Sequence, residues 1–276
     1  MIALRNIARV YKTVDPATQA VVDRIALEGW TTFNSNQLNA VNNFIIGLKA
    51  TAIWAKARTI RLKRYNDITL ENASRVNIKN PTSDVATFHG GFTYTVNGMK
   101  YNGIDSYTNE KINPVTAGLA INNFTFAHQF NDDFTVSGNA LCGIAGTVPT
   151  RRIATFPKSG AGPGTVGSNV QSNDLTNSLV LGNQGIRLQS YGRNATKKTN
   201  QIGSVYEEFA VDALGTLLNY DYYTGALNDR NTAKFFCDGT DSFFYGGEWL
   251  SESEVNTLRN LLNIFYTSTG QTLIVS

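Results

Sequence analysis

The spacing of apolar residues changes near residue 59, and this change restricts the possible folds more than any other feature of the chain. In two earlier stretches, 16–29 and 35–54, apolar residues recur three or four positions apart, which is typical of amphipathic helices. From residue 60 onward they alternate with polar residues, which is typical of strands with one face buried. The sequence therefore predicts a short helical N-terminal part and a β-rich remainder.

The β-rich part has the composition of short strands joined by tight turns. The chain holds 30 Thr, 30 Asn and 24 Gly, and only 16% of its residues are charged. Thr suits strands, whereas Asn and Gly adopt the backbone angles of turns. Asn97-Gly98 separates two strand-like runs and predicts a hairpin between 90–96 and 99–103. Further strands are predicted at 121–130, 135–144, 150–156, 178–181, 186–191, 203–211, 215–223, 233–236 and 243–248.

No alternation of strands with helices follows residue 59, so an antiparallel sandwich or barrel is favoured over a parallel sheet. The segment 157–172 is rich in Gly and Ser and is predicted to be a long loop. A capping box at Ser251 to Glu254 predicts a final helix that ends at Thr269-Gly270.

These borders divide the chain into residues 1–57, an arm with helices for oligomerisation or attachment, and residues 58–276, the sandwich. Removal of residues 1–30 is accordingly expected to abolish assembly and to leave the sandwich folded.

Charge is distributed unevenly along the chain. The net charge is +3, but residues 1–80 hold 12 basic and 5 acidic residues, and residues 81–276 hold 12 basic and 16 acidic ones. An acidic neighbouring subunit is one expected partner of the basic part, and a solvated basic face is the alternative. Single-stranded nucleic acid is disfavoured because aromatic residues do not interleave with the basic ones. The attachment candidates are Lys56, Arg58, Arg61, Lys63 and Arg64.

The N-terminal sequence has no uninterrupted apolar run of signal-peptide length, and no stretch is long and apolar enough to span a membrane. Synthesis in cytoplasm is therefore expected. In that compartment Cys142 and Cys237 are expected to be buried thiols rather than a disulfide.

Several phrases of the sequence resemble those of one family. They are LENASRVNIKNP (70–81), FHGGFTYTVNGMKYNGIDSYTNEKINP (88–114), INNFTFAHQF (121–130) and the closing FFYGGEWLSESEVNTLRNLLNIFYTSTG (243–270), preceded by a helix that ends in GLKATAIWAK (47–56). Their order is similar to that in the LamG-like, concanavalin A-like jelly-roll domains of tailed-bacteriophage virion proteins.

The resemblance implies an all-β, mainly antiparallel jelly-roll sandwich with an N-terminal helical segment and a C-terminal helix. It also implies a structural protein of the virion, in the tail, the neck or a head decoration, made in host cytoplasm. Its partners would be other virion proteins and copies of itself, with host surface glycans as a further target. A free-standing carbohydrate-binding lectin and a glycan hydrolase remain as alternatives.

No catalytic residues are predicted. A glycosidase needs two carboxylates that converge across a sugar, but Glu207 and Glu208 are adjacent and should point to opposite faces of a strand. The two histidines, His89 and His128, have no partner at a triad or zinc spacing. An enzyme is therefore not expected.

Sugar binding would require aromatic rings beside amide and carboxylate groups, and two segments supply this mixture. The candidates are Tyr191, Arg193, Asp221, Tyr222 and Tyr223, although packing within the protein is an alternative role for the tyrosines. No cofactor is expected, apart from calcium, which the resemblance implies because LamG-like domains often hold it with Asp and carbonyl oxygens at a rim. Asp105 and Asp241 are the candidates. Ordinary turn aspartates are the alternative for both.

Overall fold

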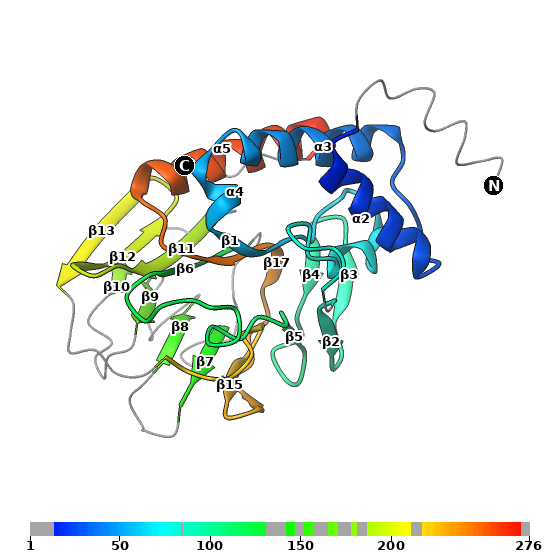
Figure 1. Ribbon diagram of the computed structural model, residues 1–276. Helices are drawn as coiled ribbons and strands as arrows, with labels where there is room; N and C mark the ends of the chain where they lie inside the picture. Colours follow the sequence, from blue (N-terminus) through cyan, green and yellow to red (C-terminus); the bar gives the residue numbers. More distant parts are fainter. Residues whose placement is uncertain are drawn as a thin grey trace.

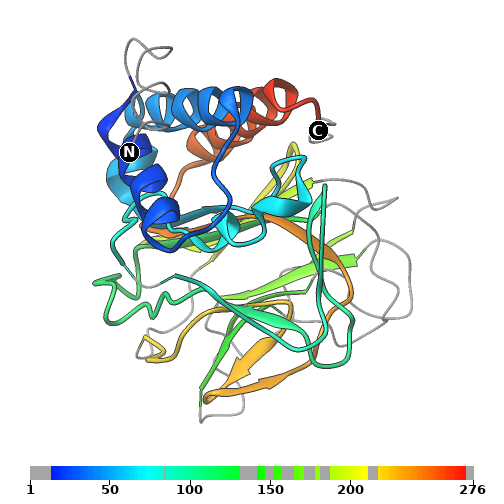
Figure 2. The same ribbon diagram turned by 90° about the vertical axis from the view of Figure 1, so that its right-hand side faces the viewer.

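The computed structural model describes residues 14–83, 85–130, 142–146, 152–156, 165–170, 178–180, 187–210 and 217–271. In this part of the chain, two mainly antiparallel β-sheets pack face to face, and a layer of helices covers the outer face of one of them (Figures 1 and 2). The fold class predicted from the sequence, a jelly-roll-like sandwich with helices at both ends, is confirmed.

Sheet A carries the helical layer. Its strands run in the order β13-β12-β11-β6-β17-β4-β3, and β1 also pairs with β17. The hairpin predicted at Asn97-Gly98 is present as β3 and β4, with Tyr94 opposite Met99. The strand bounds are β1 (Ala57–Leu62), β3 (Thr93–Thr95), β4 (Gly98–Lys100), β6 (Phe124–Phe130), β11 (Arg187–Arg193), β12 (Lys197–Ile202), β13 (Val205–Ala210) and β17 (Thr240–Gly247).

Sheet B lies on the other side of sheet A. Its strands run in the order β10-β9-β8-β7-β14-β5-β2, and the pair β15 and β16 joins it through β7. The contact between β15 and β7 is parallel, and the other pairs are antiparallel. The bounds are β2 (Thr87–His89), β5 (Tyr107–Asn109), β7 (Cys142–Ala145), β8 (Arg152–Phe156), β9 (Thr165–Val170), β10 (Ser178–Val180), β14 (Tyr223–Thr224), β15 (Leu227–Asp229) and β16 (Thr232–Lys234).

The helices begin where the sequence places capping residues. Asp15 caps α2 (Pro16–Leu27), and Asn34 and Gln37 form a reciprocal capping box at the start of α3 (Ser35–Lys49). The predicted box of Ser251 and Glu254 opens α5 (Glu252–Ser268). A short helix, α4 (Ala52–Lys56), leads into β1, and the 3₁₀ turns η1 (Ile68–Leu70) and η2 (Ala73–Arg75) follow it. None of the described helices is long and apolar enough to cross a membrane.

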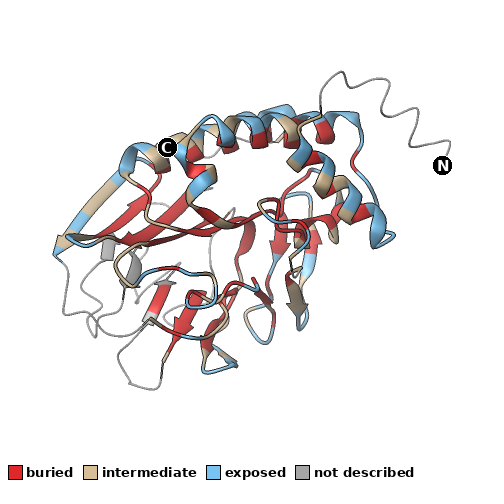
Figure 3. Ribbon diagram, viewed as in Figure 1, coloured by how far each residue is buried: buried red, intermediate tan, exposed pale blue. Residues whose placement is uncertain are grey.

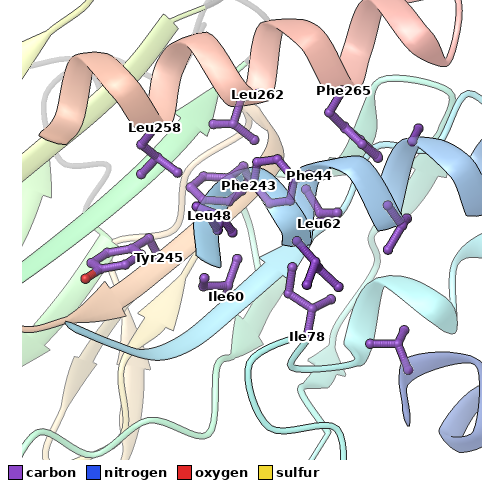
Figure 4. Close-up of a cluster of buried hydrophobic side chains, with 14 of the residues drawn as sticks. Phe44, Leu48, Ile60, Leu62, Ile78, Phe243, Tyr245, Leu258, Leu262 and Phe265 are labelled. Carbon is purple, nitrogen blue, oxygen red and sulfur yellow. The ribbon is translucent and has the colours of Figure 1, made fainter. Parts of the chain in front are cut away.

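The helices and the outer face of sheet A enclose the largest hydrophobic core (Figure 4). Phe44 of α3 packs against Phe243 of β17 and Phe265 of α5, with ring centroids 6.5 and 5.8 Å apart. Val21 and Ile25 of α2 belong to the same core and are fully buried. Because helices from residues 16–56 share this core with strands of the sandwich, a border at residue 57 does not separate two hydrophobic cores.

A second core fills the space between the two sheets. Adjacent residues of β17 are packed in different cores: Phe243 faces the helices and Phe244 faces sheet B. Both faces of the central strands β6 and β17 of sheet A are therefore buried, and these strands are red in Figure 3. The inner core includes Phe126, Ile144, Ile153, Tyr191, Tyr222 and Phe244.

The structure differs from the predicted strands and loop in several places; β2, β5 and β15, for example, were not predicted. The segment predicted as a loop, 157–172, contains β9 at residues 165–170, and its other residues lie outside the described part. In the stretch 217–224, only Tyr223 and Thr224 form a strand, although 215–223 was predicted to be one. β12 was not predicted, because KKTNQI has no apolar alternation; its place between β11 and β13 provides its hydrogen bonds. Cys142 and Cys237 are buried thiols, as expected.

Candidate functional site

Two of the five basic residues predicted to form an attachment surface pair with acids of the same chain. Lys56 Nζ lies 2.6 Å from Glu254 Oε1, and its charge lies over the ring of Trp249. Arg58 Nη2 lies 2.6 Å from Glu248 Oε1. These two pairs are partly exposed. The first joins the end of α4 to α5, and the second joins β1 to the residue after β17, so their charges are already compensated within the protein.

The other three basic residues, Arg61, Lys63 and Arg64, are buried, so the prediction that they form an attachment surface is wrong. The helical layer covers the face of β1 that holds Ile60 and Leu62, and the opposite face turns toward sheet B. Arg61 and Lys63 therefore enter the space between the sheets, where both meet Glu110. The guanidinium of Arg64 packs 4.9 Å from the ring centre of Tyr266.

The predicted sugar-binding residues Tyr191 and Tyr222 are also buried, and this corrects their assignment to a binding surface. Their hydroxyl groups are hydrogen-bonded to each other, and the Tyr222 hydroxyl is 2.7 Å from His128 Nε2. Phe126 stacks on Tyr222 with a centroid separation of 4.6 Å. Arg193, on the same strand as Tyr191, is 1% exposed and cannot meet an external ligand either. The three residues belong to the interior between the sheets.

Burial keeps His128 neutral, and this makes stability depend on pH. Desolvation and the nearby charge of Lys63 lower the pKa of His128 well below 6.5. The unfolded chain therefore binds the extra proton first, and the contribution of His128, complete above about pH 6.5, is lost as the pH falls. We expect the difference in unfolding free energy between wild type and His128→Gln to shrink below pH 6.5, by up to about 1.4 kcal/mol per pH unit. Urea unfolding of both proteins from pH 5 to pH 8 measures it, and a constant difference would contradict neutral burial.

The two calcium candidates lie apart and have different surroundings. Asp105 is exposed and accepts hydrogen bonds from the backbone N–H of Gly91 and the amide of Asn102, as a turn aspartate does. Asp241 lies in the interior against Lys63 rather than at a rim, which corrects its expected position. Within the described ranges, no group of three or more His, Cys, Asp or Glu could hold a metal ion.

Glu207 and Glu208 are adjacent residues of β13, and the carboxylate of Glu208 is engaged by other side chains of the protein. Glu208 pairs with Lys197 across the strand and accepts a hydrogen bond from the Tyr206 hydroxyl. Glu207 is opposite Asn200 in the β12–β13 ladder, whereas Glu208 is opposite Thr199. Since neighbouring residues of a strand point to opposite faces, the two carboxylates do not converge.

The remaining sugar-binding candidates, Asp221 and Tyr223, lie on the outer face of sheet B. The inner face of this region is identified by Thr108 and Thr224, whose hydroxyls bond to Tyr101 and Glu110 in the interior. Strand alternation then places Tyr107 on the outer face together with Tyr223. Of the five residues that the sequence suggested for sugar binding, Asp221 and Tyr223 are the two that lie on this outer face.

Three aromatic rings stack across β2, β5 and β14 on this outer face. The ring of His89 lies 4.5 Å from that of Tyr107, with an angle of 10° between the planes. Tyr107 in turn lies 4.7 Å from Tyr223, at 28°. His89 is exposed, Tyr107 is half-buried and Tyr223 is largely buried. We call these three residues the aromatic ladder.

Polar groups lie directly beside the aromatic ladder. The side-chain amide of Asn109, two residues after Tyr107, donates to Asp221 Oδ2 over 3.0 Å. Partial burial and the Tyr107 ring hydroxyl raise the pKa of Tyr223 to about 12, and burial raises that of Tyr107. Burial and the charge of Lys111 lower the pKa of His89. At neutral pH the ladder therefore offers two phenolic hydroxyls and an uncharged imidazole.

This geometry determines which surfaces a ligand could contact. The two faces of the Tyr107 ring are covered by its neighbours, so a ligand would meet the outer face of His89 and the ring edges. The polar rim consists of one amide and one carboxylate, which can accept and donate hydrogen bonds in fixed directions. Small-molecule binding sites also combine aromatic side chains with a few oriented polar groups.

His89, Tyr107 and Asn109 were not selected as ligand-binding residues from the sequence. Their position depends on pairing between strands that are far apart in the chain: β2 pairs with β5, and β5 pairs with β14, more than 100 residues later. The one local signal was the aromatic residue in the run Tyr107-Thr108-Asn109, which also fits ordinary packing.

No family model and no curated protein matches this sequence. Among solved structures, a mutant Trypanosoma rangeli sialidase with trans-sialidase activity is similar, with a TM-score of 0.52 and 11% sequence identity; the match covers 85% of this chain and 40% of the sialidase. Domain 4 of the arabinanase AbnA from Geobacillus stearothermophilus, solved with arabinotriose, has a TM-score of 0.48 and 14% identity, over 74% of this chain and 98% of that domain. The similarity to the sialidase concerns the fold alone, because the sequence identity is so low.

Proposed function

We propose that this protein is a carbohydrate-binding β-sandwich whose binding surface is the outer face of sheet B. The observation that carries the proposal is the aromatic ladder with Asn109 and Asp221 at its edge. A sugar ring has apolar C–H groups on its faces and hydroxyl groups around its rim. The C–H groups can pack on the outer face of the His89 ring, and the hydroxyl groups can form hydrogen bonds with the carboxylate, the amide and the phenolic hydroxyls.

The rim is set up to receive hydroxyl donors. Asn109 occupies Oδ2 of Asp221, and no other hydrogen bond to the carboxylate is found among the described residues. Hydrogen bonds to a carboxylate are stronger than those between neutral groups. Asp221 is therefore expected to accept from sugar hydroxyls and to contribute most of the specificity, while the rings contribute contact area.

A glycan array followed by titration tests the proposal. We expect Tyr107→Ala to weaken binding of the best glycan by at least about tenfold, because the loss of one interfacial anchor costs more than about 1 kcal/mol. Asp221→Asn, which keeps the shape of the side chain, should also weaken binding. The matched control is Tyr206→Ala, since Tyr206 lies at the edge of sheet A and bonds to Glu208.

Thermal melts of the three variants separate lost binding from lost folding. Unchanged affinity in folded Tyr107→Ala and Asp221→Asn would refute the proposed surface. Absence of binding by the wild type across the array would refute carbohydrate binding by this chain. Release of sugar from a bound glycan would instead support the hydrolase alternative, against our proposal of a non-catalytic protein.

The virion setting is a separate proposal that rests on the resemblance of the sequence to tailed-phage jelly rolls. In that setting the sheet B face would point away from the particle toward host glycans, and the chain would associate with copies of itself and with other virion proteins. Sedimentation of the protein with purified particles tests this setting. Recovery of the protein only in the free fraction would argue for the free-standing lectin.

A further inference from the structure

A lysine next to β1 and an aspartate of β17 meet in the interior of the sandwich. Lys63 directly follows β1, and its backbone N–H donates to the Ser242 carbonyl of β17 over 2.9 Å. Its Nζ contacts Oδ2 of Asp241, a residue 178 positions later in the chain. Both side chains are fully buried. The amine and the carboxyl group are thus held against each other by the hydrogen-bonded ladder of two neighbouring strands.

A third side chain, Glu110, completes this cluster from sheet B. Its Oε1 lies 2.5 Å from Lys63 Nζ and accepts a hydrogen bond of 2.7 Å from the Thr224 hydroxyl. Its other oxygen lies 3.2 Å from Nε of Arg61, and Glu110 is fully buried. Glu110 is therefore fixed against the amine by groups on both sheets, and Arg61 balances its charge.

The cluster holds two acids and two bases away from water, and burial opposes the charged forms of both Lys63 and Asp241. Burial raises the pKa of Asp241 to about 7, with Lys63 opposing this effect and Glu110 adding to it. Burial also disfavours the charged form of Lys63, although the two carboxylates outweigh it and raise its pKa. Transfer of one proton from Nζ to Oδ2 converts the ion pair into a neutral amine and a neutral carboxylic acid, both of which a dry interior favours.

We propose that Lys63 Nζ and Asp241 Cγ condense to an intramolecular amide bond, with Glu110 as the group that moves the proton. The neutral amine attacks Cγ of the protonated Asp241 carboxyl group, and a C–N bond forms. Glu110 takes a proton from the nitrogen and gives it to the departing hydroxyl, which leaves as water. The C–O bond breaks, Glu110 returns to its carboxylate form, and no oxidant or other reactant is needed.

Three features of the site favour the condensed product. Contact between the two groups replaces a bimolecular encounter, so the entropic cost of bringing them together is already met by folding. Condensation removes one buried cation and one buried anion and leaves Arg61 and Glu110 as a matched pair. The surrounding core, which includes the Phe244 ring 5.9 Å from Nζ, keeps out the water that would reverse the reaction.

The intact mass of the purified, unfolded protein tests this proposal. The wild type should weigh less than its sequence by the mass of one water molecule, and proteolysis should release a branched peptide that joins Lys63 to Asp241. Asp241→Asn is a nearly isosteric second test, because its condensation would release ammonia instead and would change the mass loss accordingly. Folded wild type with its full sequence mass would overturn the proposal.

Two further variants assign the roles of the residues. Lys63→Arg keeps the positive charge and should show no mass loss. Glu110→Gln keeps the shape of the side chain but cannot accept the proton, so condensation should slow by at least tenfold when it is followed by mass from the time of refolding. Equal rates in the wild type and in folded Glu110→Gln would show that Glu110 does not move the proton. Thermal melts confirm which variants fold.

Discussion

Phe244→Ala should destabilise the protein by about 3–5 kcal/mol, the usual cost of removing a buried phenylalanine from a packed core. Phe244 is fully buried between the two sheets. Its ring centre lies 5.2 Å from that of Tyr222 and 5.0 Å from that of His128. His128 is held in β6 of sheet A, and Tyr222 is held next to β14 of sheet B by backbone hydrogen bonds to Ile112 and Glu110, so these neighbours cannot collapse into the space that alanine would leave.

Urea unfolding measures this effect, and a second phenylalanine is the matched control. Phe235 is 41% exposed, and its replacement by alanine should change stability by less than about 0.5 kcal/mol. If both variants lost the same small amount, the two sheets would not pack against each other through Phe244 as described.

Removal of residues 1–30 should destabilise the sandwich, contrary to the expectation from sequence. The deletion removes Val21 and Ile25, which are fully buried in the core shared with α5 and sheet A. At about 1.5–3 kcal/mol for each buried side chain, the loss is about 3–6 kcal/mol. It also removes Asp15, whose carboxylate is 2.5 Å from Lys49 Nζ, and exposes the covered surface of α3.

Thermal denaturation of the truncated and full-length proteins checks this prediction. The matched variant is Val21→Ala with Ile25→Ala, which keeps the helix and removes only the buried groups. If the truncated protein and the double variant both melted at the temperature of the full-length wild type, α2 would not be part of the core.

The elements that could be predicted from sequence are those whose signals are local. The capping box at Ser251 and Glu254 and the turn at Asn97-Gly98 act over a few residues, and both are present. The alternation of Ile60 and Leu62 with charged residues also predicted β1 correctly. The prediction that the charged residues of this stretch are exposed was wrong. Alternation normally places charged side chains in solvent, whereas here sheet B covers the face that carries them.

The candidate site could be predicted only in part, since it depends on contacts between distant strands. The acids that pair with Lys63 lie 47 and 178 residues later in the chain. Tyr222 and Tyr223 looked equivalent in the sequence, but neighbours in a strand face opposite ways. Tyr222 therefore joins the interior, and Tyr223 joins the aromatic ladder. The uneven charge of the chain has a similar explanation, because Arg58 of β1 and Lys63 directly after it pair with acids from later in the chain, Glu248 and Glu110.

Hydrogen exchange with and without a saturating glycan from the array tests the proposed binding surface most directly. We predict slower exchange in β2, β5 and β14, the strands that carry His89, Tyr107 and Tyr223, and unchanged exchange in β12 and β13. Protection confined to β12, β13 or the helical layer would contradict the assignment of the outer face of sheet B as the glycan-binding surface.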